Sequence, residues 1–207
     1  MKQLVAVAAL AALIAGAAGA QTTKKELPVV VLETSKGNVE IELYPDKAPI
    51  TVQNFLYYVD NKFFDDLIFH RVIADFMVQG GGFTPEMAQK TGKPAIENEA
   101  DNGLTNDKYT IAMARTSEPN SATSQFFINT KDNAFLNFKS KTPQGWGYCV
   151  FGKTVAGKEV VDAIGKVKTG SKNGMNDVPV EPVKIVKAYR KGAAPKETAP
   201  AGTTPKG

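Results

Sequence analysis

The sequence predicts a mainly β fold, a closed eight-stranded antiparallel β-barrel capped by two α-helices. Three observations support this prediction. The apolar runs are short and rich in β-branched or aromatic residues, most of them are bounded by Gly, Asn, Pro or Asp, and only two segments have helical spacing. Seven or eight short strands with two helices favour a closed or nearly closed barrel whose ends the helices plug.

The first two strands are predicted to form a β-hairpin. β-Branched residues dominate the segment 29–34, and residues 39–43 alternate between apolar and acidic side chains. Between them, the segment 35–38 contains Gly37 and Asn38, which are expected to form the turn.

A helix is predicted directly after this hairpin. Val52, Phe55, Leu56 and Val59 follow the i, i+3, i+4, i+7 spacing that places them on one helical face, and Pro49 suits the first helical turn. A second helix is expected over Val155–Lys166, with its apolar residues facing inward. These residues are Val160, Val161 and Ile164.

The remaining strands are expected where short apolar runs lie between turn-forming residues. They are Ile68–Ile73, Phe76–Gln79, Tyr109–Ala114, Gln125–Ile128, Tyr148–Phe151 and Val183–Tyr189. The long polar segment Thr84–Asp107 is predicted to be a loop, and loops of that length in a compact domain are usually functional or mobile.

Both ends of the chain differ in composition from this domain. Residues 1–20 contain Lys2, an apolar run and a final Ala-Gly-Ala, which is typical of a signal peptide cleaved before Gln21. The alternative is a membrane anchor, but the apolar run is shorter than the ~20 residues that a span needs. Residues 191–207 are almost all Ala, Pro, Gly, Thr and Lys, and are expected to form a disordered tail. The folded domain is therefore placed at residues 27–190, and a periplasmic location is expected.

The composition also excludes several kinds of chemistry. Basic residues exceed acidic ones by 25 to 21, but nearly all are scattered lysines, so no nucleic-acid partner is expected. The single Cys149 excludes an intrachain disulfide, and the single His70 excludes a two-histidine metal site. Neither a phosphate-binding loop motif nor a G-x-S-x-G motif is present. We expect no metal and no cofactor.

Residues 69–83, FHRVIADFMVQGGGF, are the most informative segment. In a strand, Arg71 and Ile73 share one face while His70 and Val72 share the other. A guanidinium in an apolar run is unfavourable unless it is paired, or unless it lies at a strand end with its head in water. We expect His70 to be a packed strand residue with no catalytic role.

Further segments complete a pattern. They are IAMART at 111–116, SQFFIN at 124–129, NAFLN at 133–137 and GYCVFG at 147–152. Together with the FHRVI and FMVQGG runs, and in this order, they resemble the cyclophilin family of peptidyl-prolyl cis-trans isomerases. The resemblance covers residues 29 to 189 and is closest to the bacterial exported branch.

The resemblance implies a role for each matching residue. Arg71 matches the catalytic arginine, and Gln79 matches a glutamine that orients this arginine and contacts the peptide. The apolar pocket for the substrate proline matches Phe76, Met77, Phe127 and Leu136. The groove for residues that precede the proline matches Ala114, Arg115 and Gln125.

Two positions depart from the pattern of eukaryotic cyclophilins. Phe135 stands where those proteins usually have Trp, and Tyr148 where they usually have His. The missing indole N–H removes a donor that helps to bind cyclosporin, so weak or no cyclosporin binding is expected. Isomerase activity is still expected, because neither residue performs proton chemistry.

Prolyl isomerisation suits a chain without the usual catalytic groups. The barrier of ~18–20 kcal/mol arises from amide resonance, and a fixed guanidinium that favours the twisted amide would lower it without a nucleophile or metal. The expected partners are proline-containing peptides and unfolded exported proteins, and a monomer suffices. The alternative is a non-catalytic module that holds proline-containing segments. Whether Trp146 packs in its loop or touches substrate is left open.

Overall fold

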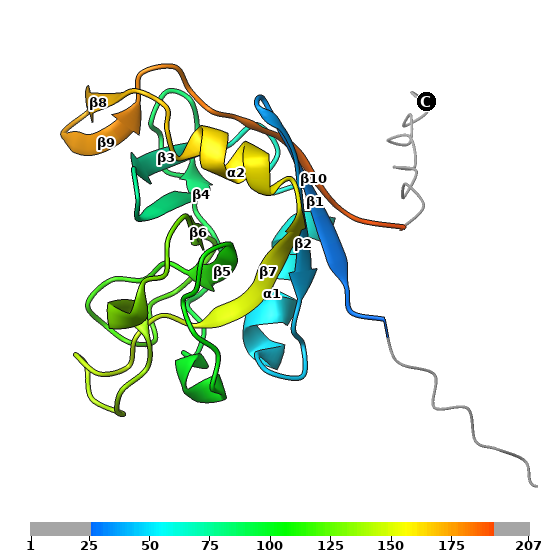
Figure 1. The fold of residues 1–207 in the computed structure, drawn as a ribbon, viewed down its shortest axis with the longest axis vertical. Helices are drawn as coiled ribbons and strands as arrows, with labels where there is room; N and C mark the ends of the chain where they lie inside the picture. Colours follow the sequence, from blue (N-terminus) through cyan, green and yellow to red (C-terminus); the bar gives the residue numbers. More distant parts are fainter. Residues whose placement is uncertain (1–25, 193–207) are drawn as a thin grey trace, which may run out of the picture.

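The computed structural model describes residues 26–192, which form a nearly closed antiparallel barrel (Figure 1). The strands are β1 (Val29–Thr34), β2 (Gly37–Leu43), β3 (Ile68–Ile73), β4 (Met77–Phe83), β5 (Thr110–Met113), β6 (Phe126–Asn129), β7 (Val150–Ala156), β8 (Thr169–Lys172), β9 (Met175–Pro179) and β10 (Ile185–Arg190). Eight of them form one sheet in the order β10-β1-β2-β7-β5-β6-β4-β3, and β8 pairs with β9 alone. The predicted eight-stranded barrel is confirmed.

The barrel closes where its two edge strands, β3 and β10, approach each other. The bridge between Ile68 and Lys184 is antiparallel. The Ile185 N–H donates to the Leu67 carbonyl at 2.7 Å, and the Phe69 N–H donates to the Val183 carbonyl at 2.9 Å. These bonds satisfy edge groups that would otherwise be open to pairing with another chain.

Helix α1 (Pro49–Asp60) buries the predicted face and is capped from a distant loop. Val52, Phe55, Leu56 and Val59 are all at most 8% exposed, as their spacing predicts. The carboxylate of Glu99 accepts hydrogen bonds from the backbone N–H groups of the first helical turn. Because these groups have no partner within the helix, Glu99 stabilises the helix and ties the long 84–107 loop to the barrel.

The second helix, α2 (Lys158–Ile164), is shorter than the predicted segment Val155–Lys166, which is a correction. Val155 belongs to β7 because that strand continues pairing with β2, where Ala156 lies opposite Glu40. The change from strand to helix occurs at Gly157, whose φ is +78°. A Cβ there would lie 2.1 Å from a backbone carbonyl, so only glycine fits. In Figure 1, α2 crosses one end of the barrel.

Several other boundaries differ from the prediction, and the strands predicted at Tyr109–Ala114, Gln125–Ile128 and Val183–Tyr189 are each displaced by one or two residues at their ends. The hairpin turn is formed by Ser35 and Lys36, while Gly37 already pairs with Thr34 as the first residue of β2. The strand predicted at Tyr148–Phe151 begins at Val150 and runs on, and the one predicted at Phe76–Gln79 extends to Phe83. Hydrogen-bonded pairing across the sheet, rather than local hydrophobicity, sets these ends.

The β8–β9 hairpin was not predicted. Its residues are mostly exposed and do not alternate between apolar and polar side chains. Apolar packing holds the hairpin in place instead, because Val178 is buried in one cluster with Ile68 of β3 and Met87 of the 84–107 loop. The hairpin therefore lies next to β3 (Figure 1).

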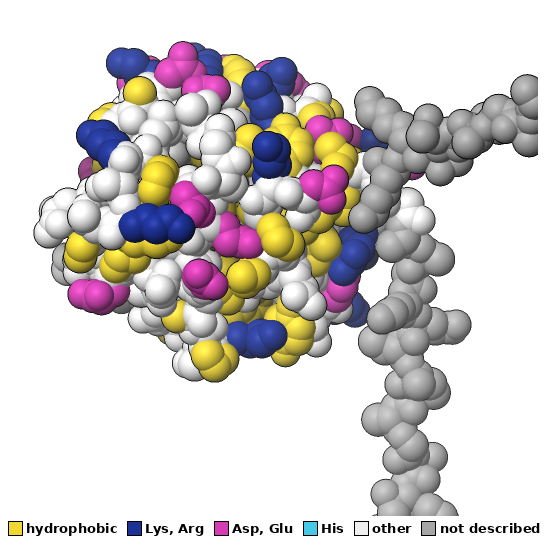
Figure 2. Space-filling model, turned by 90° about the horizontal axis from the view of Figure 1, so that it is seen from below, with side chains coloured by type: hydrophobic (Ala, Val, Ile, Leu, Met, Phe, Trp, Pro, Cys, Tyr) yellow, Lys and Arg dark blue, Asp and Glu magenta, His cyan; other side chains and the backbone are white. Residues whose placement is uncertain are grey.

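Apolar side chains fill the barrel interior, and the largest fully buried ones are aromatic. The ring of Phe55 from α1 packs on those of Phe64, Phe126 and Phe151, with centroids 5.2 to 5.5 Å apart. Such pairs add to the stabilisation that burial itself provides. On the outer surface, basic and acidic side chains are interspersed with apolar ones over the face that Figure 2 shows.

The two terminal segments predicted from the sequence lie mostly outside the residues that the structure describes. The expected signal peptide (1–20) and most of the expected tail (191–207) fall outside residues 26–192. Within that range, no helix is long and apolar enough to cross a membrane.

His70 is buried in β3, and its environment disfavours protonation. The predicted alternation is wrong at this point because a bulge separates Phe69 from Arg71. Phe69 and Val72 both pack in the barrel core, whereas His70 packs on Phe83, which belongs to a separate cluster. The His70 side chain is 1% exposed, its ring packs on Phe83 with centroids 4.5 Å apart, and its Nδ1 atom has no hydrogen-bond partner. Burial, with a smaller contribution from the charge of Arg71, lowers the pKa of His70 from 6.5 to about 4.

We therefore expect folding stability to fall as the pH falls from about 6.5 to about 4, because the unfolded state binds a proton there that the folded state does not. A shift of this size corresponds to about 3 kcal/mol of unfolding free energy. Urea unfolding of the wild type and a His70→Leu variant across this range measures it. The variant should lose most of the slope between pH 6.5 and 5, and parallel curves would contradict the prediction.

Candidate functional site

A cavity of about 110 Å³ opens on the outer face of strands β3 to β6. Its lining residues are Arg71, Phe76, Met77, Gln79, Ala114, Arg115, Phe127, Leu136 and Tyr148. All of them were predicted as site residues from the sequence. The structure thus brings together residues that are separated by up to 77 positions in the chain, as from Arg71 to Tyr148.

The pairing of the strands explains this convergence. Arg71 on β3 lies opposite Gln79 on β4, and Gln79 lies opposite Phe127 on β6. Residues directly opposite each other in a sheet point to the same face, so these three side chains form a row across neighbouring strands. A register slip of one residue would send each side chain to the other face.

The floor of the cavity is apolar and well packed. Met77, Phe127 and Leu136 are 2%, 4% and 8% exposed, and they form a cluster separate from the barrel core. The ring of Phe127 meets that of Tyr148 edge to face at a centroid distance of 5.6 Å. A small apolar ring such as that of proline could be held here out of water.

Two glutamines form a polar edge. The Gln79 amide donates to the side-chain oxygen of Gln125 at 3.0 Å. Gln125 does not line the cavity itself but fixes a residue that does. A Cβ on Gly82 would lie 2.6 Å from the Gln125 side chain. Glycine at position 82 therefore leaves room for the Gln125 side chain.

Arg71 lies at the edge of the cavity and is half exposed. Its side chain is 39% exposed, and its Nε atom lies 3.9 Å from the carboxylate of Asp177 on β9. The resemblance implied that Gln79 orients this arginine, whereas the structure pairs Gln79 with Gln125. Sequence reasoning missed Asp177, because the hairpin that carries it has no strand pattern of its own.

Arg115 is held by backbone carbonyls. Its Nε donates to the Gly147 carbonyl and one terminal nitrogen to the Thr116 carbonyl, both at 2.8 Å. The guanidinium also stacks over the Tyr148 ring, 4.7 Å from its centroid. Because these contacts hold the guanidinium in place, Arg115 forms part of the cavity lining.

Phe135 lies at the rim. It is 65% exposed, does not line the cavity, and stacks on Phe76 with centroids 5.6 Å apart. An exposed aromatic ring at this place offers an apolar contact to a bound chain.

A larger and more open groove of about 570 Å³ lies next to the cavity. Arg115 and Tyr148 line both spaces, so the two adjoin. Glu118 gives the groove an acidic side chain, and Lys139 adds a second basic one to Arg115. Its dimensions allow an extended polypeptide that reaches beyond one proline.

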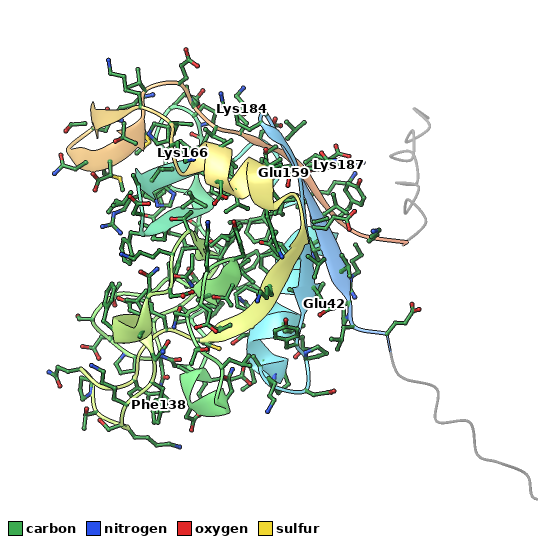
Figure 3. The ribbon with its side chains drawn as sticks, in the orientation of Figure 1. Glu42, Phe138, Glu159, Lys166, Lys184 and Lys187 are labelled. Atoms are coloured by element: carbon green, nitrogen blue, oxygen red, sulfur yellow. The ribbon has the colours of Figure 1, made fainter. Side chains whose placement is uncertain are left out.

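Trp146 packs in the loop beside this groove. Its ring lies 5.5 Å from that of Phe138, which Figure 3 labels in the same loop region, and Lys141 lies over its face. It does not line the cavity or the groove, so its contacts are those of a packing residue.

The groups that line the cavity offer hydrogen-bond donors and apolar contacts to a ligand. Cys149 is 3% exposed, and burial raises the pKa of its thiol to about 12, so it is inert as a nucleophile. Within residues 26–192 no three His, Cys, Asp or Glu side chains are placed to hold a metal ion. What the site presents is a guanidinium beside a cavity with an apolar floor.

Comparison with protein families matches residues 29–190 to the "Cyclophilin type peptidyl-prolyl cis-trans isomerase/CLD" family. The chain is 62% identical over 162 residues to a peptidyl-prolyl cis-trans isomerase, cyp18, of Streptomyces antibioticus, covering 78% of this chain and 98% of that protein. It is 54% identical over 157 residues to peptidyl-prolyl cis-trans isomerase B of Escherichia coli, covering 76% and 96%.

The fold is also similar to solved structures. A crystal structure of a Cryptosporidium parvum cyclophilin-type peptidyl-prolyl cis-trans isomerase, solved in the presence of the dipeptide Ala-Pro, matches with a TM-score of 0.66 at 26% identity. The match covers 78% of this chain and 97% of that one.

Proposed function

Since the chain belongs to the cyclophilin family and is a peptidyl-prolyl cis-trans isomerase, we propose that Arg71 is its catalytic residue and that exported proteins are its substrates. One observation supports the first part above all others. The Arg71 guanidinium lies at the edge of a cavity whose floor is formed by Met77, Phe127 and Leu136. This arrangement has a cation beside an apolar surface against which a proline ring could pack.

The proposed mechanism follows from the chemistry of the peptide bond. Rotation disrupts amide resonance, so the proline nitrogen becomes pyramidal and gains a lone pair in the twisted state. A guanidinium that donates to this nitrogen, or to the adjacent carbonyl, stabilises the twisted state more than either planar isomer. Arginine suits this role because its planar group keeps its charge and can be held in one orientation.

The other residues hold the peptide while the bond rotates. Phe76, Met77, Phe127 and Leu136 anchor the proline ring. Gln79 is proposed to contact the peptide, with Gln125 restraining its amide through the 3.0 Å hydrogen bond. Ala114, Arg115 and Gln125 are proposed to hold the residues before the proline, and Tyr148 and Phe135 contribute apolar surface.

One experiment tests catalysis against simple holding. NMR exchange spectroscopy follows cis/trans exchange of a short Ala-Pro peptide, and suppression of aggregation of an unfolded protein is measured with the same preparation. Isomerase function requires exchange far faster than the uncatalysed tens of seconds. Peptide binding without accelerated exchange would instead identify the non-catalytic module.

The exported role is proposed from the two ends of the chain and from bacterial relatives. Residues 1–20 have the pattern of a cleaved signal peptide, 27–190 form the isomerase domain and 191–207 a disordered tail. Expression in a Gram-negative host, with fractionation and intact mass measurement, tests this. We expect periplasmic protein beginning at Gln21, and full-length protein in the cytoplasm would contradict export.

Weak cyclosporin binding is proposed from the exposed ring at Phe135. A Phe135→Trp variant restores an indole donor at the rim, and one such hydrogen bond contributes about 1 kcal/mol. We therefore expect the dissociation constant for cyclosporin to fall roughly five- to tenfold, as measured by inhibition of peptide exchange. Equal affinity in variant and wild type would show that the indole does not limit binding.

A further inference from the structure

The candidate catalytic arginine has an acidic partner that comes from outside the strands of its site. The Nε atom of Arg71 lies 3.9 Å from Oδ2 of Asp177, in the β8–β9 hairpin. In the part of the chain that the structure describes, this is the one ion pair that Arg71 makes. Both side chains are about 40% exposed, at 39% and 41%.

The hairpin is held firmly against the strand that carries Arg71. Val178, next to Asp177, is 3% exposed and packs in a cluster with Ile68, the first residue of β3. Figure 1 shows the hairpin beside β3. The backbone that carries the Asp177 carboxylate is therefore held next to β3 by an apolar contact one residue away.

The backbone at Asp177 is held in an unfavourable conformation. Its φ is +62°, in the left-handed region that non-glycine residues rarely adopt. Aspartate and asparagine tolerate this region better than other side chains do. Such a conformation persists where the surrounding structure holds it, and it is found disproportionately at functional sites.

The ion pair leaves the two terminal amino groups of Arg71 available to donate to a bound peptide. Asp177 approaches Nε, so it does not occupy the two terminal amino groups of a side chain that lines the cavity. An ion pair this exposed adds little to folding stability. The expected effect of the ion pair is instead to reduce the number of rotamers that the long Arg71 side chain adopts.

From these observations we infer that Asp177 is a positioning residue that orients the Arg71 guanidinium toward the cavity. The inference rests on the proposed role of Arg71 as catalytic residue. A donor already aimed at the twisted amide needs no reorganisation when the bond rotates, and this is the source of its effect on rate. Asp177 itself touches no substrate.

An Asp177→Asn variant tests the inference, because asparagine keeps the shape and tolerates the positive φ. We measure the dissociation constant of an uncharged, end-blocked Ala-Pro peptide and its exchange rate at saturation. The exchange rate should fall three- to tenfold while the dissociation constant changes less than twofold. The NMR signal of the Arg71 Nε–H group should shift as well. An Asp177→Glu variant, which retains the charge, should recover part of the rate.

A matched control comes from a second arginine–aspartate pair that does not line the cavity. Asp60 accepts two hydrogen bonds from Arg190, and the two side chains are as exposed as those of Arg71 and Asp177. Asp60→Asn removes an equivalent charge from the surface. It should leave exchange rate and peptide affinity unchanged, so a loss shared by both variants would overturn a specific role for Asp177.

A further variant separates this inference from the proposed function. If Arg71→Ala abolishes activity but Asp177→Asn does not alter the rate, Arg71 is catalytic and the positioning role is wrong. If neither variant changes the rate, the proposed role of Arg71 is itself wrong. In the Arg71→Ala background, Asp177→Asn should have no further effect, and an additional loss of rate would contradict positioning through Arg71.

Discussion

Replacing Arg71 with alanine is expected to reduce the catalysed exchange of an Ala-Pro peptide about 100-fold, in line with the loss of one preorganised donor. The fold should remain, because the side chain is half exposed and its ion pair with Asp177 contributes little stability. NMR exchange at saturating peptide measures the rate, and urea unfolding checks the fold.

Arg190 supplies the control for this variant. It also lies on an edge strand, it is ion-paired and its side chain is likewise 39% exposed, but it faces Asp60 away from the cavity. Arg190→Ala should therefore cost as much stability as Arg71→Ala or more, while full activity remains. An Arg71→Ala variant with the wild-type exchange rate would show that this guanidinium does not act on the peptide bond.

Truncating the floor of the cavity has a different signature. Phe127→Ala should lower the free energy of unfolding by about 3–5 kcal/mol, because the ring is 4% exposed and its removal leaves a void. The same change should raise the dissociation constant for an Ala-Pro peptide at least tenfold, since it removes the surface against which the proline ring packs. Urea unfolding and peptide titration measure the two effects.

Phe126, the residue next to Phe127, serves as a control that separates the effect on stability from the effect on peptide binding. Phe126 lies on the opposite face of β6, is fully buried and packs in the barrel core rather than under the cavity. Conservative variants at both positions keep the fold, so Phe126→Leu and Phe127→Leu can be compared directly. Both should be destabilised, but only Phe127→Leu should weaken peptide binding, and equal weakening would place the proline elsewhere.

The helix α1 and the faces of the central strands could be predicted from spacing alone. Val52, Phe55, Leu56 and Val59 are buried as the helical period requires, and Phe126 and Phe127 pack on opposite faces of β6 as a strand requires. These features depend on local geometry that every helix or strand shares. The site residues were predicted from motif resemblance, and the lining of one cavity by nine of them reflects the strand order.

Contacts between distant segments decided the rest. The second helix begins late because β7 remains paired with β2 through Ala156, which no local pattern reveals. The β8–β9 hairpin has mostly exposed side chains and exists through its packing on β3, so its own sequence has no periodic signal.

The sequence by itself therefore determined the barrel class, the buried face of α1 and, through motif resemblance, the residues that line the cavity. The tertiary structure alone decided where strands end and which partner each polar side chain meets. Gln79 bonds to Gln125 and Arg71 meets Asp177, 106 positions along the chain. Periodicity reports which side of an element is buried, whereas a long polar side chain pairs with whatever group the closed barrel brings within reach.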